Sequence, residues 1–188
     1  MAGQLSHNDL DFIKTLRQSG VLQDVDGHRL DQRNGVILVT CADGDRFYDI
    51  FEHQVKMQAG QRLDPRIHVL SWHGGALACA PRSPVNKRKR AHEVFLDQIA
   101  DARAIKGINV VALDAHAPCG AAALGNVDLP RCIALHIRAK TKIKTLNQGI
   151  EVACFFPVDY GGGKKRTYFL SRARWEKWAK KNQPHLAD

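Results

Sequence analysis

VILVTCADGDR at residues 36–46 and INVVALDAHAPC at residues 108–119 decide the fold of this chain. Each segment begins with a continuous run of apolar residues rich in Val and Ile. Such a run is typical of a strand that is buried on both faces within a parallel sheet. Each run ends in polar residues and cysteine, so the two strands are expected to present functional side chains at their carboxyl ends.

Helical and strand-like segments alternate around these two strands. IHVLSW at residues 67–72 predicts another buried strand, and residues 47–55 have apolar side chains at helical spacing. Residues 76–86 contain two prolines and predict a loop. A longer helix is expected over residues 87–105. Its apolar face would carry Val94, Phe95, Ile99, Ala102 and Ile105.

The two ends of the chain predict further elements. Ser6 and Asp9 match a capping box, so residues 1–35 are expected to form a helix followed by a polar loop. Residues 135–146 fit either a helix or a strand. IEVACFF and RTYFL, at residues 150–156 and 166–170, predict a hairpin joined through three glycines. A closing helix capped by Ser171 would carry Trp175 and Trp178.

This order predicts one α/β domain over residues 1–188, with a mostly parallel central sheet flanked by helices. The chain is 44% apolar and 25% charged, which are ordinary values for a globular protein. No apolar run approaches the roughly 18 residues that span a bilayer. No secretory signal is visible either, so a cytoplasmic protein is expected. Five scattered cysteines argue against a disulfide framework.

Basic residues outnumber acidic ones and give a formal net charge of +9. Residues 87–90 are KRKR, residues 138–144 carry a basic side chain at every second position, and residues 164–181 add more. Lys and Arg contact phosphate without sequence specificity, so nucleic-acid binding is one interpretation. No recognition motif or interleaved aromatic residues accompany these runs. A solvated surface is therefore favoured, and nucleic acid is not expected as a partner.

Three residues at the predicted strand ends are candidate metal ligands. Cys41 ends one strand, and His116 and Cys119 follow the other. Two thiolates and one imidazole suit Zn²⁺ and leave a fourth tetrahedral position for water, as in catalytic zinc sites. The alternative is that these cysteines pack as small apolar side chains. The remaining cysteines are expected to pack as small apolar side chains, and they are Cys79, Cys132 and Cys154.

Asp43 and Arg46 follow Cys41 closely and are candidate catalytic residues. A carboxylate beside a zinc-bound water can accept its hydrogen bond. An arginine can hold that carboxylate ionised and oriented. The alternative is a polar turn that bends at Gly44, but the neighbouring metal ligand favours the catalytic interpretation.

These motifs resemble those of a known family. VILVTCADGDR is similar to the β-class carbonic anhydrase segment in which an apolar strand ends in Cys-x-Asp-x-Arg, and VVALDAHAPCGAA is similar to that family's strand followed by His-x-x-Cys-Gly. The resemblance implies that Cys41, His116 and Cys119 bind zinc and that Asp43 partners an active-site arginine. It also implies reversible hydration of carbon dioxide to bicarbonate by a zinc-bound hydroxide, in a homodimer or higher homo-oligomer.

The chain departs from the family's pattern at two places. The family's arginine comes two residues after the aspartate, where this chain has Asp45, and Arg46 comes one place later. The family's Arg-Asn-Ala-Gly type of turn is replaced by the sequence SWHGG at residues 71–75. Two alternatives stay open. One is a carbon disulfide or carbonyl sulfide hydrolase on the same scaffold, and the other is a catalytically silent zinc-binding homologue that acts as a binding protein.

Overall fold

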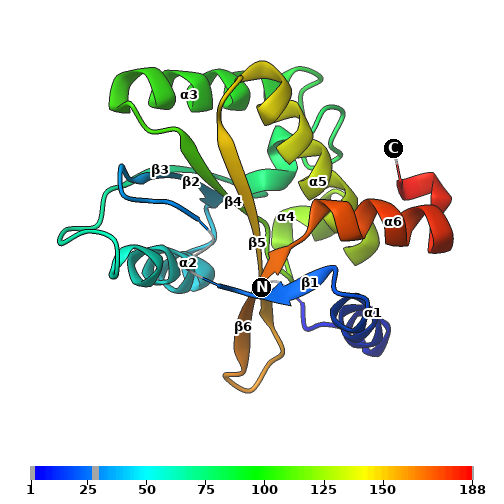
Figure 1. Ribbon diagram of the computed structural model, residues 1–188. Coiled ribbons are helices and arrows are strands. Elements are labelled where there is room, and N and C mark those ends of the chain that lie inside the picture. The colour runs from blue at the N-terminus through cyan, green and yellow to red at the C-terminus, as the bar shows by residue number, and fades with distance from the viewer. Residues whose placement is uncertain (1–2, 27–29, 188) are drawn as a thin grey trace.

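A mixed sheet of six strands runs through the structure, a computed structural model that describes residues 3–26 and 30–187 (Figure 1). The strands are β1 (Leu22–Asp24), β2 (Val36–Cys41), β3 (Ile67–Trp72), β4 (Val110–Asp114), β5 (Glu151–Asp159) and β6 (Lys165–Leu170). The helices are α1 (His7–Gln18), α2 (Gly44–Gln58), α3 (Ala91–Lys106), α4 (Gly120–Leu124), α5 (Leu129–Leu146) and α6 (Arg172–Asn182). Two short 3₁₀ helices are η2 (Gly75–Cys79) and η3 (Pro184–Leu186).

The strand order is β1-β6-β5-β4-β2-β3. The four strands from β5 to β3 are parallel, whereas β6 and β1 pair antiparallel at one side. The predicted α/β fold with a mostly parallel sheet is therefore confirmed. Because β2 and β4 are neighbours, with Val39 opposite Leu113, their carboxyl ends meet at the same edge.

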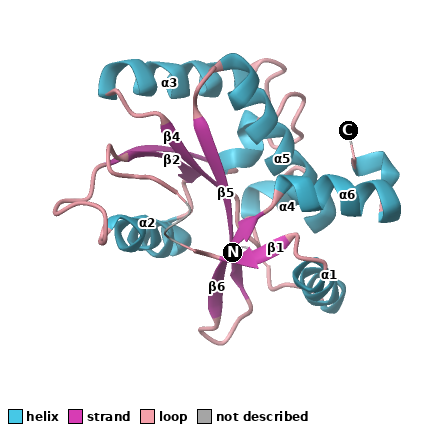
Figure 2. Cartoon of the chain, in the orientation of Figure 1, coloured by secondary structure: helices cyan, strands magenta, loops and turns pink. Residues whose placement is uncertain are grey.

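Helices cover both faces of this sheet (Figure 2). Every residue of β2 is buried, which explains its continuous apolar sequence. Ile50 and Met57 of α2 pack on one face. The other face carries the larger core, to which α1, α3, α5 and α6 contribute. No helix formed by residues 3–26 and 30–187 is both long enough and apolar enough to cross a membrane.

Three elements differ from the sequence-based expectation. β1 lies within the segment expected to be helix and loop, and it is too short to show a pattern of its own. The helix expected from residue 87 begins at Ala91, and two residues of its expected apolar face are exposed, Val94 by 59% and Ile105 by 74%. Part of the expected loop at 76–86 is the 3₁₀ helix η2. The ambiguous segment 135–146 is helical and belongs to α5.

His136 of α5 is fully buried in this core, and its Nε2 lies 2.8 Å from the carbonyl oxygen of Leu113. Burial lowers the pKa of His136 to about 4, with the nearby Lys140 acting in the same direction. The imidazole is therefore neutral in the folded chain, and its Nε2–H donates to the carbonyl. In the unfolded chain the pKa returns to about 6.5, so the unfolded state binds the proton first.

We expect this histidine to make the fold sensitive to acid. As the pH falls from about 6.5 to about 4, the free energy of unfolding should decrease by about 3 kcal/mol through His136 alone. His136→Gln keeps a donor for the Leu113 carbonyl but cannot titrate. Urea unfolding of both proteins at several pH values should show a steeper acid loss in the parent chain. Parallel pH profiles would contradict this assignment.

Candidate metal centre

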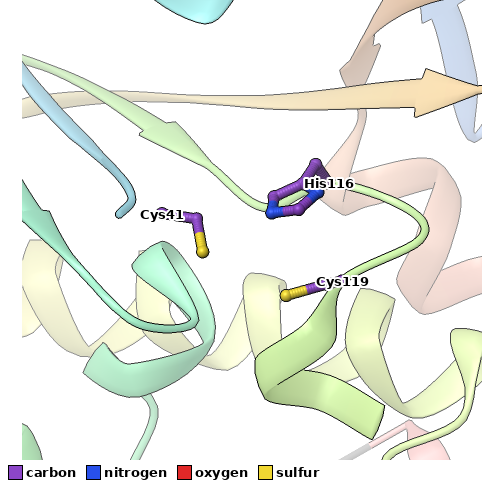
Figure 3. Close-up of side chains that lie close together, drawn as sticks. All are labelled: Cys41, His116 and Cys119. Atoms are coloured by element: carbon purple, nitrogen blue, oxygen red, sulfur yellow. The ribbon is translucent and has the colours of Figure 1, made fainter. Parts of the chain in front are cut away.

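Cys41, His116 and Cys119 meet at the carboxyl ends of β2 and β4 (Figure 3). Cys41 is the last residue of β2, His116 lies in the segment that follows β4, and Cys119 is the N-cap of α4. One ligand atom of each residue, two thiol sulfurs and an imidazole nitrogen, lies within 4.8 Å of the other two. The structure therefore brings together the three residues that the sequence predicts as metal ligands.

Backbone contacts fix the positions of these side chains. The segment after β4 is held against β5, because the Ala117 N–H donates to the Pro157 carbonyl at 2.9 Å and the Asp159 N–H donates to the Ala117 carbonyl at 2.8 Å. On the other side of the centre, the Gly74 N–H donates to the Cys41 Sγ at 3.3 Å. Main-chain N–H groups thus hold both the segment after β4 and the side chain of Cys41 in place.

The three side chains are shielded from water. Cys41 is 3% exposed, His116 2% and Cys119 8%. Both ring nitrogens of His116 are buried without a hydrogen-bond partner among the described residues. A buried polar atom without a partner costs about 1–3 kcal/mol, and a metal ion would accept the lone pair of one nitrogen. The donor set and this orphaned imidazole both fit Zn²⁺.

The two thiols differ in acidity because they lie beside each other. The interaction with Cys41 lowers the pKa of Cys119, and the nearby His116 acts in the same direction. Its neighbour Cys119 raises the pKa of Cys41, as does burial. Cys119 is therefore the thiol that ionises first, and a thiolate is the form that binds a metal.

The two predicted catalytic residues have different surroundings. Asp43 is the N-cap of α2, accepts a hydrogen bond from the Asp45 N–H at 3.1 Å, and has its Oδ2 3.8 Å from the Nε2 of His116. Arg46 lies in the first turn of α2, and its guanidinium forms an ion pair with Asp159 at 2.5 Å. Asp43 thus lies beside the metal centre, whereas Arg46 is paired with another carboxylate.

Sequence patterns do not indicate Asp159 or Asp114 as parts of this region. Asp159 ends β5, and the Gly161 N–H and then Arg46 lower its pKa. Asp114 ends β4, and burial raises its pKa well above the ordinary value. One sequence feature could have indicated Asp114. It lies at the end of an apolar run, two residues before His116. Nothing in the sequence near residue 159 points to Arg46.

Neither a model of a known protein family nor a curated protein matches the chain. Solved structures do match it. A carbonic anhydrase from Streptococcus mutans is 15% identical with a TM-score of 0.45, and the match covers 90% of this chain and 100% of that one. β-Carbonic anhydrase isoform I from Trichomonas vaginalis is 16% identical with a TM-score of 0.42, covering 89% and 100%. A β-carbonic anhydrase from Aspergillus fumigatus is 14% identical with a TM-score of 0.38, covering 93% and 94%.

Proposed function

We propose that this protein is a zinc enzyme that hydrates carbon dioxide reversibly to bicarbonate. The observation that carries the proposal is the buried group of Cys41, His116 and Cys119, whose ligand atoms all lie within 4.8 Å of one another beside the Asp43 carboxylate. Three ligands of this kind leave a fourth tetrahedral position open, as catalytic rather than structural zinc requires. The chemistry that zinc supplies when bound is Lewis acidity, which ionises water near neutral pH.

Asp43 would orient the attacking water. Its Oδ2 lies near His116, and its other carboxylate oxygen accepts the Asp45 N–H, so the carboxylate is held by the first turn of α2. A carboxylate fixed in this way can accept a hydrogen bond from water and direct the oxygen lone pair at the carbon of the substrate. The side chain of Asp43 is 21% exposed, so water can reach the carboxylate.

A small cavity beside His116 favours a small substrate. Its volume is about 30 Å³, and its wall includes His116, Arg46, Ile50 and Val158. A cavity of this volume admits only a molecule of a few atoms. A compact linear molecule suits such a space better than a peptide, sugar or nucleotide does.

The Asp43 carboxylate supplies the test of this proposal. Asp43→Asn keeps an N-cap for α2, because Asn caps helices as well as Asp does, but it removes the charge. We expect the turnover of zinc-loaded protein, measured by stopped-flow hydration, to fall about 10–100-fold while the zinc content stays unchanged. Asp128→Asn makes the same substitution at the N-cap of α5 and should leave turnover unaffected. Full activity of Asp43→Asn would remove Asp43 from the mechanism.

One observation favours a second candidate, a catalytically silent zinc-binding homologue. The guanidinium of Arg46 forms its ion pair with Asp159, a carboxylate other than that of Asp43. If the reaction needs that arginine, zinc-loaded protein will show no hydration at any pH. The same apparatus with carbon disulfide or carbonyl sulfide tests the hydrolase alternative. The homo-oligomer and the cytoplasmic location that the sequence predicts stay predictions.

A further inference from the structure

Helices α5 and α6 are labelled in Figure 1. Residues of these two helices and of η3 line a second hollow, away from the metal centre. Its volume is about 700 Å³. None of the candidate metal ligands lines it, and neither does Asp43 or Arg46. Five basic side chains form part of its wall: Arg82, Arg131, Arg138, Lys142 and Arg172.

The basic residues at every second position of 138–144 line two different cavities, because this segment is part of helix α5. Arg138 and Lys142 are four residues apart, so they lie on the same side of the helix, and both line the hollow. Lys140 and Lys144 line a different cavity, between α5 and the β1–β5 region. Arg131 lies two turns before Arg138 on the face that lines the hollow. Three basic residues of α5, Arg131, Arg138 and Lys142, therefore line the same hollow.

Basic side chains outnumber acidic ones in the wall of the hollow. Among the described residues, Glu176 is the one acidic member of this wall, and its Oε1 accepts a hydrogen bond from the Arg172 Nε at 2.5 Å. Arg82 adds a cation from a residue with a φ of +57°, a conformation that non-glycine residues rarely adopt. Such backbone conformations are common at functional sites. An anionic ligand in the hollow would contact Arg82, Arg131 and Lys142.

Apolar side chains form most of the rest of the wall, together with Thr141 and Thr145. Ile137 is 5% exposed, Trp175 is 2% exposed, and Ala134 lies between the basic residues of α5. An apolar wall with a few charged groups is typical of small-molecule sites, which have volumes of about 300–1,000 Å³. An apolar body carrying phosphate would contact both kinds of side chain.

We propose that this hollow binds an organic phosphate of nucleotide size. The arginine guanidinium matches the geometry of phosphate oxygens and can bind two of them at once. Nucleic acid fits less well, because a strand needs several exposed rings on which successive bases stack, and the one aromatic residue among the described lining residues, Trp175, is buried. A second copy of the chain fits less well too, because in a two-fold dimer built on this face the five basic side chains would face the same five on the other copy. The proposal is independent of the proposed reaction.

Calorimetric titration of the full zinc-loaded chain with ADP, without magnesium, tests this proposal. One ADP should bind per chain, more weakly as salt increases. Arg131→Ala and Lys142→Ala should each weaken binding about tenfold or more, because each removes a charge-assisted contact. Lys144→Ala is the matched control on the same helix, and it should change the affinity by no more than about twofold. Thermal melts would establish that the exposed substitutions leave the fold intact.

Four outcomes would overturn the proposal. The first is no ADP binding, and the second is an equal loss in Lys144→Ala, which indicates unspecific attraction to a basic surface. The third is binding of a short poly-glutamate peptide or of single-stranded DNA more tightly than ADP. The fourth is a heat signal fully accounted for by zinc leaving the chain, since it then reports chelation and no ADP is bound in the hollow. Hydration activity is not part of this readout, so the two proposals can fail separately.

Discussion

Cys119→Ser is expected to leave the purified protein nearly free of zinc, whereas the parent chain should carry about one zinc per molecule. The hydroxyl of serine ionises far less readily than a thiol and is a poor ligand for zinc. The effect should be especially large at this position, because the pKa of Cys119 is lowered by Cys41 and His116 and its thiolate forms first. Metal analysis by atomic absorption after gel filtration measures the result.

Cys132→Ser is the control for this substitution. Cys132 is also buried, but it lies on α5 outside the group of three ligands, and burial raises its pKa. This variant should keep its zinc, although it loses some packing. Equal zinc contents in the two variants would remove the ligand assignment, and the proposed reaction with it.

Gly75→Ala is expected to destabilise the chain by at least about 3 kcal/mol and to reduce its zinc content. Gly75 has a φ of +47°, and a Cβ placed there would lie 2.6 Å from the Cys41 nitrogen and 2.8 Å from the Asp114 carbonyl oxygen. These are main-chain atoms of two sheet strands, so they cannot move aside cheaply. Relief of the clash would shift the end of β2, where Cys41 lies.

Gly107→Ala is the control for this substitution, because it carries the cost of a left-handed backbone conformation without a steric clash. Gly107 has a φ of +64°, but nothing lies within 4 Å of a Cβ built there. Its substitution should cost about 1–2 kcal/mol, the penalty for a left-handed residue, with zinc content unchanged. Urea unfolding and metal analysis of both variants test the difference. Equal losses of stability would show that close packing around Gly75 has no effect.

The parts of the fold that the sequence predicts are those with strong burial requirements. β2 and β4 are buried on both faces, so their residues are apolar except for Thr40 and Asp114 near the carboxyl ends, and the pattern is unmistakable. Residues 135–146 are ambiguous in sequence because α5 is buried on much of its circumference and carries apolar residues at both spacings. β1 cannot be predicted, because three residues paired with a distant strand show no period.

The candidate site is partly predictable for a related reason. Parallel strands bring their carboxyl ends to one edge, so the sequence alone is enough to place Cys41 and His116 together. The partner of Arg46 cannot be found in this way. Successive residues of a helix point about 100° apart, so a shift of one position turns the side chain in a new direction. In this chain that direction leads to Asp159 of β5.

The pairing of β1 with β6 has a consequence for how the chain folds. Leu22 lies opposite Leu170, so most of the chain separates the two partners. During synthesis on the ribosome, β1 emerges long before the strand that it needs, while β2, β3, β4 and β5 become available in turn. β2, β3, β4 and β5 can therefore pair, and bring the candidate metal ligands together, before β1 joins the sheet. In this order β1 joins β6 last, and the step orders only the short segment between β1 and β2, because the rest of the sheet is already in place.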